Sequence, residues 1–217
     1  MTTQSHPATS TAEAGPAAVP ARPMHEIGLV ADPTSLGLAA FATTTFVFGL
    51  SYTTLWNSNV SVASTLQLAL IYGGAIQVLA GIWAFARRST FPAVTFCSYG
   101  AFYVGYYVYI TSIAPGVRGR DAATSLALFL LAWMIFSSYV WIASLQVSGV
   151  DAAVFFFWWL AYLLLVIGEF LGNTNVIIGG GAAAIASAAT AWYASGALLI
   201  NVTFGKDRLP LFATHSR

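Results

Sequence analysis

Charged side chains are scarce in this chain. They make up 7% of its residues, whereas a soluble domain carries roughly a quarter. Between Thr34 and Asn201 the charged residues are Arg87, Arg88, Arg118, Arg120, Asp121, Asp151 and Glu169. Of these, only Glu169 lies inside a long apolar run. So few charges cannot cover a surface that faces water, and the outer surface must therefore face lipid.

Other absences exclude several classes of function. The three histidines lie in the tails, and no Cys, His and carboxylate cluster has metal-ligand spacing. No serine has an evident general base, so we expect no metal, no cofactor and no enzymatic activity. The single lysine, Lys206, follows the last apolar run, which excludes a retinal Schiff base. A net charge of +1 without a basic patch predicts no binding of nucleic acid.

Long apolar runs take up most of the sequence. Apolar residues make up 58% of the chain and the mean hydropathy is +0.76. A helix needs about 20 apolar residues to cross a bilayer. The sequence predicts an all-α bundle of six transmembrane helices, over Ser35–Trp56, Val62–Ala86, Pro92–Ala114, Ala122–Leu145, Ala152–Leu171 and Val176–Val202.

The predicted organisation is one transmembrane domain between two tails. Residues 1–31 are rich in Ala, Pro, Ser and Thr, which is typical of disorder. Residues 32–204 hold the helices, and residues 205–217 form a short tail. Lysine and arginine are enriched in cytoplasmic loops, and their distribution favours both termini in the cytoplasm. That orientation places Arg22, Arg87, Arg88, Lys206, Arg208 and Arg217 inside and only Arg118 and Arg120 outside.

Uncharged polar side chains interrupt the apolar helices. Gln77 lies in the second predicted helix, where an unpaired amide is costly. Tyr99, Tyr103 and Tyr106 follow the helical spacing of one face in the third helix. One interpretation is the wall of a solute path, in which hydroxyls and amides replace part of the solute's hydration. The alternative is that hydroxyls bond back to their own helix and tyrosines lie at membrane interfaces.

Two acidic residues lie near predicted helix ends. Glu169 precedes the Gly172-Asn173 turn, and an acid inside a membrane helix is usually functional. It is either a protonatable group at an external vestibule or a partly hydrated interfacial acid. Asp32, before Pro33, has the position of a helix N-cap at a cytoplasmic mouth.

Several separated motifs resemble one family. They are Asp32-Pro33-Thr34-Ser35-Leu36-Gly37-Leu38, Tyr72-Gly73-Gly74-Ala75-Ile76-Gln77, Phe96-Cys97-Ser98-Tyr99-Gly100, Gly172-Asn173 and Phe204-Gly205-Lys206-Asp207-Arg208. In this order they are similar to the acetate uptake transporter family, over roughly residues 32–210. The resemblance implies six helices, a homo-hexamer in the plasma (inner) membrane, and one path in each subunit.

The resemblance also implies a narrow constriction made by a Phe, a Tyr and a Leu. The Phe and Tyr fall on Phe41 and Tyr99, and the Leu position, counted back from Gly172-Asn173, holds Trp158. We expect Trp158 to narrow or reshape the constriction. Polar contacts along the path are assigned to Thr44, Thr45, Gln77, Ser98 and Asn173, with Asp32 and Leu36 at the cytoplasmic mouth and Glu169 as a proton-linked group.

The resemblance and the polar helix residues together predict transport of acetate and related small carboxylates. Proton symport and passive anion conduction both stay open. Two other hypotheses are a channel for a neutral small solute, which fits the lack of buried cations, and a membrane sensor that does not transport. The short tails argue against the sensor, since they leave no room for a signalling domain.

Overall fold

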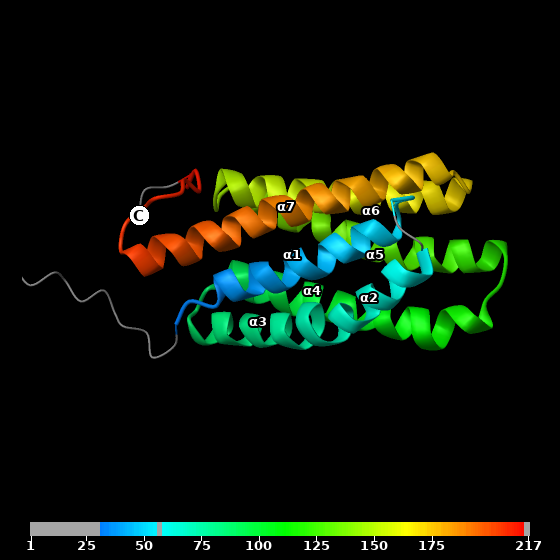
Figure 1. Cartoon of the computed structure of the whole chain (residues 1–217), viewed down its shortest axis with the longest axis horizontal. Helices are drawn as coiled ribbons and strands as arrows, with labels where there is room; N and C mark the ends of the chain where they lie inside the picture. The colour runs from blue at the N-terminus through cyan, green and yellow to red at the C-terminus, as the bar shows by residue number, and fades with distance from the viewer. Residues whose placement is uncertain (1–30, 56–57, 215–217) are drawn as a thin grey trace, which may run out of the picture.

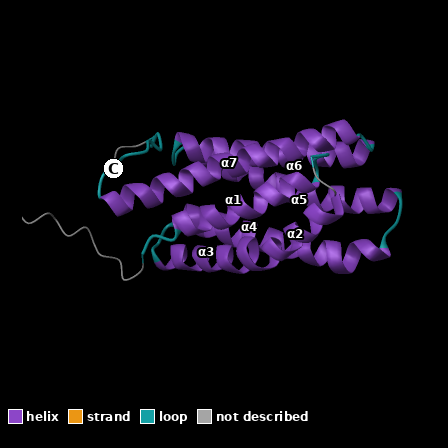
Figure 2. Cartoon of the chain, viewed as in Figure 1, coloured by secondary structure: helices purple, strands orange, loops and turns teal. Residues whose placement is uncertain are grey.

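The structure is a computed structural model that describes residues 31–55 and 58–214. Within these ranges every regular element is helical, which confirms the predicted all-α fold (Figure 2). The elements are α1 (Thr34–Ser51), α2 (Ser58–Leu70), η1 (Ile71–Ile76), α3 (Gln77–Ala86), α4 (Thr90–Val108), η2 (Tyr109–Ile113), η3 (Ala114–Gly116), α5 (Arg120–Ser144), α6 (Gly149–Leu171) and α7 (Thr174–Phe204). The predicted tail over residues 1–31 lies outside the described residues, apart from residue 31.

The elements form six continuous rods that correspond to the six predicted segments. The rods are α1, α2–η1–α3, α4–η2–η3, α5, α6 and α7. Five of them, over Thr34–Ser51, Val60–Ala86, Arg120–Ser144, Gly149–Leu171 and Thr174–Phe204, are long and apolar enough to cross a membrane. The sixth, α4, has 19 residues but carries several tyrosines that lower its hydropathy.

The rods run side by side in an elongated bundle (Figure 1). Helix α7 packs against α1 and α6, α6 packs against α5, and α4 packs against α3. The start of α1 and the end of α7 lie at the same end of the bundle (Figure 1). The two ends lie together because the chain runs along the bundle an even number of times. Which end of the bundle faces the cytoplasm stays a prediction.

The predicted end of the first helix was wrong. It was placed at Trp56, but α1 ends at Ser51. The Thr53 hydroxyl donates to the Leu50 carbonyl, and the Leu55 amide donates to the Thr53 hydroxyl. Such local side-chain bonds compete with the backbone pattern of a helix, so the chain turns before the apolar run is over.

Helices α1 and α7 approach closely where each carries a glycine. A Cβ added to Gly181 would lie 2.7 Å from the Gly49 carbonyl oxygen. A Cβ added to Gly49 would lie 2.8 Å from the Gly181 carbonyl oxygen. Small residues allow such backbone approach between membrane helices.

The second rod contains a π-helical turn that the sequence analysis did not predict. It is η1, between α2 and α3, and it includes Gly73 and Gly74. A Cβ on Gly73 would lie 2.6 Å from the Thr44 hydroxyl oxygen of α1. The π-helical turn therefore places the backbone of Gly73, which has no side chain, directly against α1. Short π-helical insertions of this kind are frequent at functional sites.

Candidate functional site

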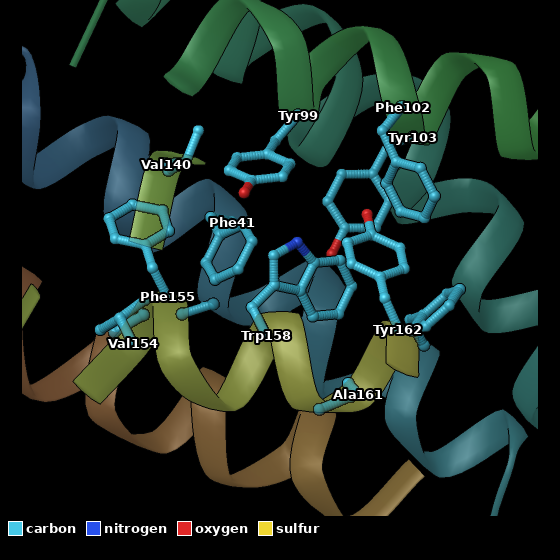
Figure 3. Packing of buried hydrophobic residues seen from close by; sticks show 14 of the residues in the cluster. Phe41, Tyr99, Phe102, Tyr103, Val140, Val154, Phe155, Trp158, Ala161 and Tyr162 are labelled. Atoms are coloured by element: carbon cyan, nitrogen blue, oxygen red, sulfur yellow. The ribbon is translucent and has the colours of Figure 1, made fainter. Parts of the chain in front are cut away.

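Three aromatic rings from three helices meet in the centre of the bundle. They belong to the predicted constriction residues Phe41 of α1, Tyr99 of α4 and Trp158 of α6 (Figure 3). Ring centroids are 5.3 Å apart for Phe41 and Trp158, 5.8 Å for Phe41 and Tyr99, and 6.3 Å for Tyr99 and Trp158. Residues 41, 99 and 158 are thus in mutual contact, although they are far apart in the sequence.

Trp158 is the centre of a larger aromatic cluster. Its indole also packs on Phe48, Phe102 and Tyr162, at centroid distances of 5.6, 5.8 and 4.6 Å. Trp158 is 0% exposed, and Phe41 and Tyr99 are 2% and 1% exposed. The rings fill the space between the helices, so a solute can pass only if at least one ring moves.

Two hydroxyls near the cluster are bound to partners within the protein. The Thr45 hydroxyl is hydrogen-bonded to the Tyr103 hydroxyl. The Tyr99 hydroxyl is 3.0 Å from the Ser137 hydroxyl of α5. These contacts join α1 to α4 and α4 to α5. They leave Thr45, a predicted path residue, with less capacity for a solute than an unpartnered threonine.

Other buried polar atoms have no hydrogen-bond partner among the described residues. They are Thr44 Oγ1, both amide atoms of Gln77, Trp158 Nε1 and the Tyr162 hydroxyl oxygen. Each of these side chains is fully buried. Orphaned buried polar groups are rare, because each costs about 1–3 kcal/mol. Such groups are therefore available to a transient polar ligand.

Thr44 and Gln77 belong to the same interface between helices. Thr44 lies over Gly73 in η1, and Gln77 begins α3 about one turn further along the rod. Helix α1 contacts both η1 and α3. Both are predicted path residues, and both are buried in the interior beside the π-helical turn.

Glu169 lies near the far end of α6 and is half-buried. Its carboxylate is within electrostatic reach of the Tyr52 and Tyr106 hydroxyls. Those two hydroxyls are 3.4 Å apart.

The remaining predicted path and mouth residues differ in their surroundings. Asn173 is exposed and caps α7, accepting from the Asn175 and Val176 amides at 3.0 and 3.3 Å. Ser98 is half-buried beside Tyr99. Asp32 is exposed and accepts from the Thr34 amide and hydroxyl at 2.9 and 2.6 Å. The predicted N-cap position was wrong by one residue, because the N-cap of α1 is Pro33. Leu36, 36% exposed, lies in the first turn of α1.

Within the described ranges, no group of three or more His, Cys, Asp or Glu side chains has the geometry of a metal site. The central cluster consists of aromatic rings and uncharged polar groups. They offer no arrangement of a nucleophile with a base.

Comparison with known proteins assigns this architecture. A sequence model of the GPR1/FUN34/yaaH family matches residues 14–206. The chain belongs to the GPR1/FUN34/yaaH family. This finding confirms the resemblance seen in the sequence motifs, and with the apolar helices it makes the chain a multi-pass membrane protein.

Members of the GPR1/FUN34/yaaH family with known names are similar over different lengths. Acetate permease A of Emericella nidulans is 34% identical over 54% of this chain and 42% of its own length. Ammonia transport outward protein 2 of Saccharomyces cerevisiae is 32% identical, over 79% and 61%. The succinate–acetate/proton symporter SatP of Escherichia coli is 27% identical, over 86% and 97%. The chain thus spans less than two thirds of the two fungal relatives.

A solved structure of the bacterial acetate channel SatP has the same fold. It superposes on this chain with a TM-score of 0.78 and 27% sequence identity. The match covers 84% of this chain and 99% of the solved chain. The helical arrangement is therefore that of a membrane channel.

This GPR1/FUN34/yaaH member also has central residues that the sequence motifs did not identify. Tyr162 and Phe48 both pack on Trp158, and Ser137 bonds Tyr99. Tyr162 follows Trp158 by four residues, so helical spacing on one face was a signal that could have found it. Ser137 lay in an apolar helix with no comparable signal.

Proposed function

We propose that this chain transports acetate and related small carboxylates across a membrane. The observation that carries the proposal is the closed ring contact of Phe41, Tyr99 and Trp158, together with the buried, unpartnered polar atoms of Thr44 and Gln77. Acetate has a methyl group that suits aromatic rings and a carboxylate that suits hydroxyl and amide donors. Its passage requires no catalysed reaction.

The polar lining supports weak binding, which conduction needs. The buried groups near the rings are neutral, so a carboxylate would be held by hydrogen bonds rather than by a fixed cation. A solute must bind well enough to enter and weakly enough to leave. An apolar constriction that opens and closes also provides a gate.

Proton symport and passive anion conduction both fit this arrangement. One relative is named a succinate–acetate/proton symporter, and one solved structure is named an acetate channel. In the symport form, the half-buried Glu169 near Tyr52 and Tyr106 is the group that takes up and releases the proton. We further propose a homo-hexamer in the plasma (inner) membrane, with both termini in the cytoplasm.

A second candidate is conduction of a neutral small solute. It is favoured by the uncharged central cluster and by the relative named ammonia transport outward protein 2. The two candidates are distinguished by measuring uptake of labelled acetate into proteoliposomes in the presence of excess unlabelled acetate or excess methylamine. Carboxylate transport predicts that acetate competes and methylamine does not.

An inward proton gradient that raises the rate of acetate uptake would favour symport, and an unchanged rate would favour the channel.

A further inference from the structure

Trp158 carries an obligate hydrogen-bond donor into the aromatic cluster. Its indole N–H can donate but cannot accept. The side chain is 0% exposed, and no acceptor among the described residues satisfies the hydrogen-bond geometry. A ring that served only as an apolar plug would not need this group, since a phenylalanine would fill the space without an unpaired donor.

Tyr162 brings a second donor to the same place. It follows Trp158 by one turn of α6, its ring centroid is 4.6 Å from that of Trp158, and its hydroxyl has no partner among the described residues. No hydrogen bond between the Trp158 Nε1–H and the Tyr162 hydroxyl meets the distance and angle that such a bond requires. Figure 3 shows both polar atoms directed from α6 towards the rings of α4.

We propose that Trp158 Nε1–H and the Tyr162 O–H form a two-donor site for the substrate carboxylate, one donor for each oxygen. This proposal rests on the function proposed above and names the groups that touch the anion at the constriction. Two neutral donors on one helix face match the two oxygens of a carboxylate. They also bind it without the strong attraction of a buried cation.

The neighbouring residue provides a matched comparison. Trp159 is also an α6 tryptophan, but its Nε1–H donates to the Ser138 hydroxyl at 3.0 Å. Its ring stacks on Trp141, with centroids 5.2 Å apart, outside the cluster of Phe41, Tyr99 and Trp158. A substrate-dependent effect on Trp158 that spares Trp159 therefore reports the proposed site rather than a general change in α6.

The test observes the indole N–H groups of the full chain directly. The protein is labelled with ¹⁵N-tryptophan in lipid nanodiscs, and the signals of its seven tryptophans are recorded during titration with sodium acetate. Spectra of the Trp158→Phe and Trp159→Phe variants assign two of the signals. We expect the Trp158 signal to shift with saturation and the Trp159 signal to stay in place. Sodium chloride at equal ionic strength should move neither.

Uptake kinetics give a second readout. Trp158→Phe and Tyr162→Phe keep a ring but remove a donor, and each should raise the KM for acetate roughly tenfold, since a hydrogen bond to a charged group is being lost. Trp159→Phe should leave the KM unchanged.

A Trp158 signal that does not change with acetate, in a protein that takes up acetate, would overturn the two-donor site and leave the transport function standing. It would show that Trp158 and Tyr162 satisfy each other or a water molecule. No uptake by the unmodified protein would instead overturn the transport function.

Discussion

The indole ring of Trp158 lies at 89° to the phenyl ring of Phe41, with ring centroids 5.3 Å apart. This contact joins α6 to α1 across the centre of the bundle. An edge-to-face aromatic pair contributes about 0.5–1.5 kcal/mol beyond the area that it buries. A contact of this strength can be broken at low cost when one ring moves aside.

The size of residue 158 should set the size of the permitted substrate. Trp158→Leu and Trp158→Ala remove ring volume at the closed contact with Phe41 and Tyr99. We expect succinate uptake to rise severalfold relative to acetate uptake in both variants, measured with labelled substrates in proteoliposomes. Trp159→Leu, outside the cluster, should keep the original ratio. An unchanged ratio in the Trp158 variants would place the constriction elsewhere.

Gln77 should matter for transport and not for stability. Gln77→Leu replaces an unpartnered buried amide by an apolar side chain of similar size. Because no hydrogen bond is lost, the free energy of unfolding should not fall, while acetate uptake should drop at least severalfold. Thermal unfolding in detergent and uptake in proteoliposomes check the two parts.

Thr45→Val is the matched contrast to Gln77→Leu. It leaves the buried Tyr103 hydroxyl without its partner, which should cost about 1–3 kcal/mol of stability. A Gln77→Leu protein that unfolds as early as Thr45→Val would show that Gln77 has a structural role instead.

Sequence patterns predicted the helices well and their irregularities poorly. Apolar runs located six rods, because lipid requires long uninterrupted apolar helices. The end of α1 was missed since it depends on the Thr53 hydroxyl, and the π-helical turn at Gly73 since it depends on packing against Thr44. Local chemistry of this kind has no periodic signal.

The candidate site was also predicted only in part. Family motifs located Phe41, Tyr99 and Trp158, which the structure brings into contact. Asn173 carried an equally plain motif, but its side chain caps α7. A motif marks a residue that a fold requires, and only packing shows whether its polar atoms are already in use.

Glu169 should modify transport rather than carry it. It is half-buried near the end of α6, within electrostatic reach of Tyr52 and Tyr106. Glu169→Gln removes the titratable group with little change in shape. Acetate uptake should therefore persist, while its dependence on external pH should change across the range of a carboxyl group. Initial rates at a series of external pH values measure this, and complete loss of uptake would make Glu169 essential.

The close approach of α1 and α7 should tolerate no side chain at Gly181. Gly181→Ala would place a Cβ 2.7 Å from the Gly49 carbonyl oxygen. Overpacking of this kind typically costs about 1–3 kcal/mol, so the melting temperature in detergent should fall. Gly196→Ala, on the same helix, meets no described atom within 4 Å and should leave the melting temperature unchanged or raise it. Equal effects of the two substitutions would contradict the close approach.

Saturable acetate uptake is the most direct test of the central claim that the ring constriction and its polar neighbours pass a small carboxylate. The measurement is the initial rate of labelled acetate entry into proteoliposomes over a series of acetate concentrations, with empty liposomes as the baseline. The account predicts a rate well above the baseline that saturates with acetate and falls when unlabelled acetate competes. A rate equal to that of empty liposomes at every concentration would contradict it.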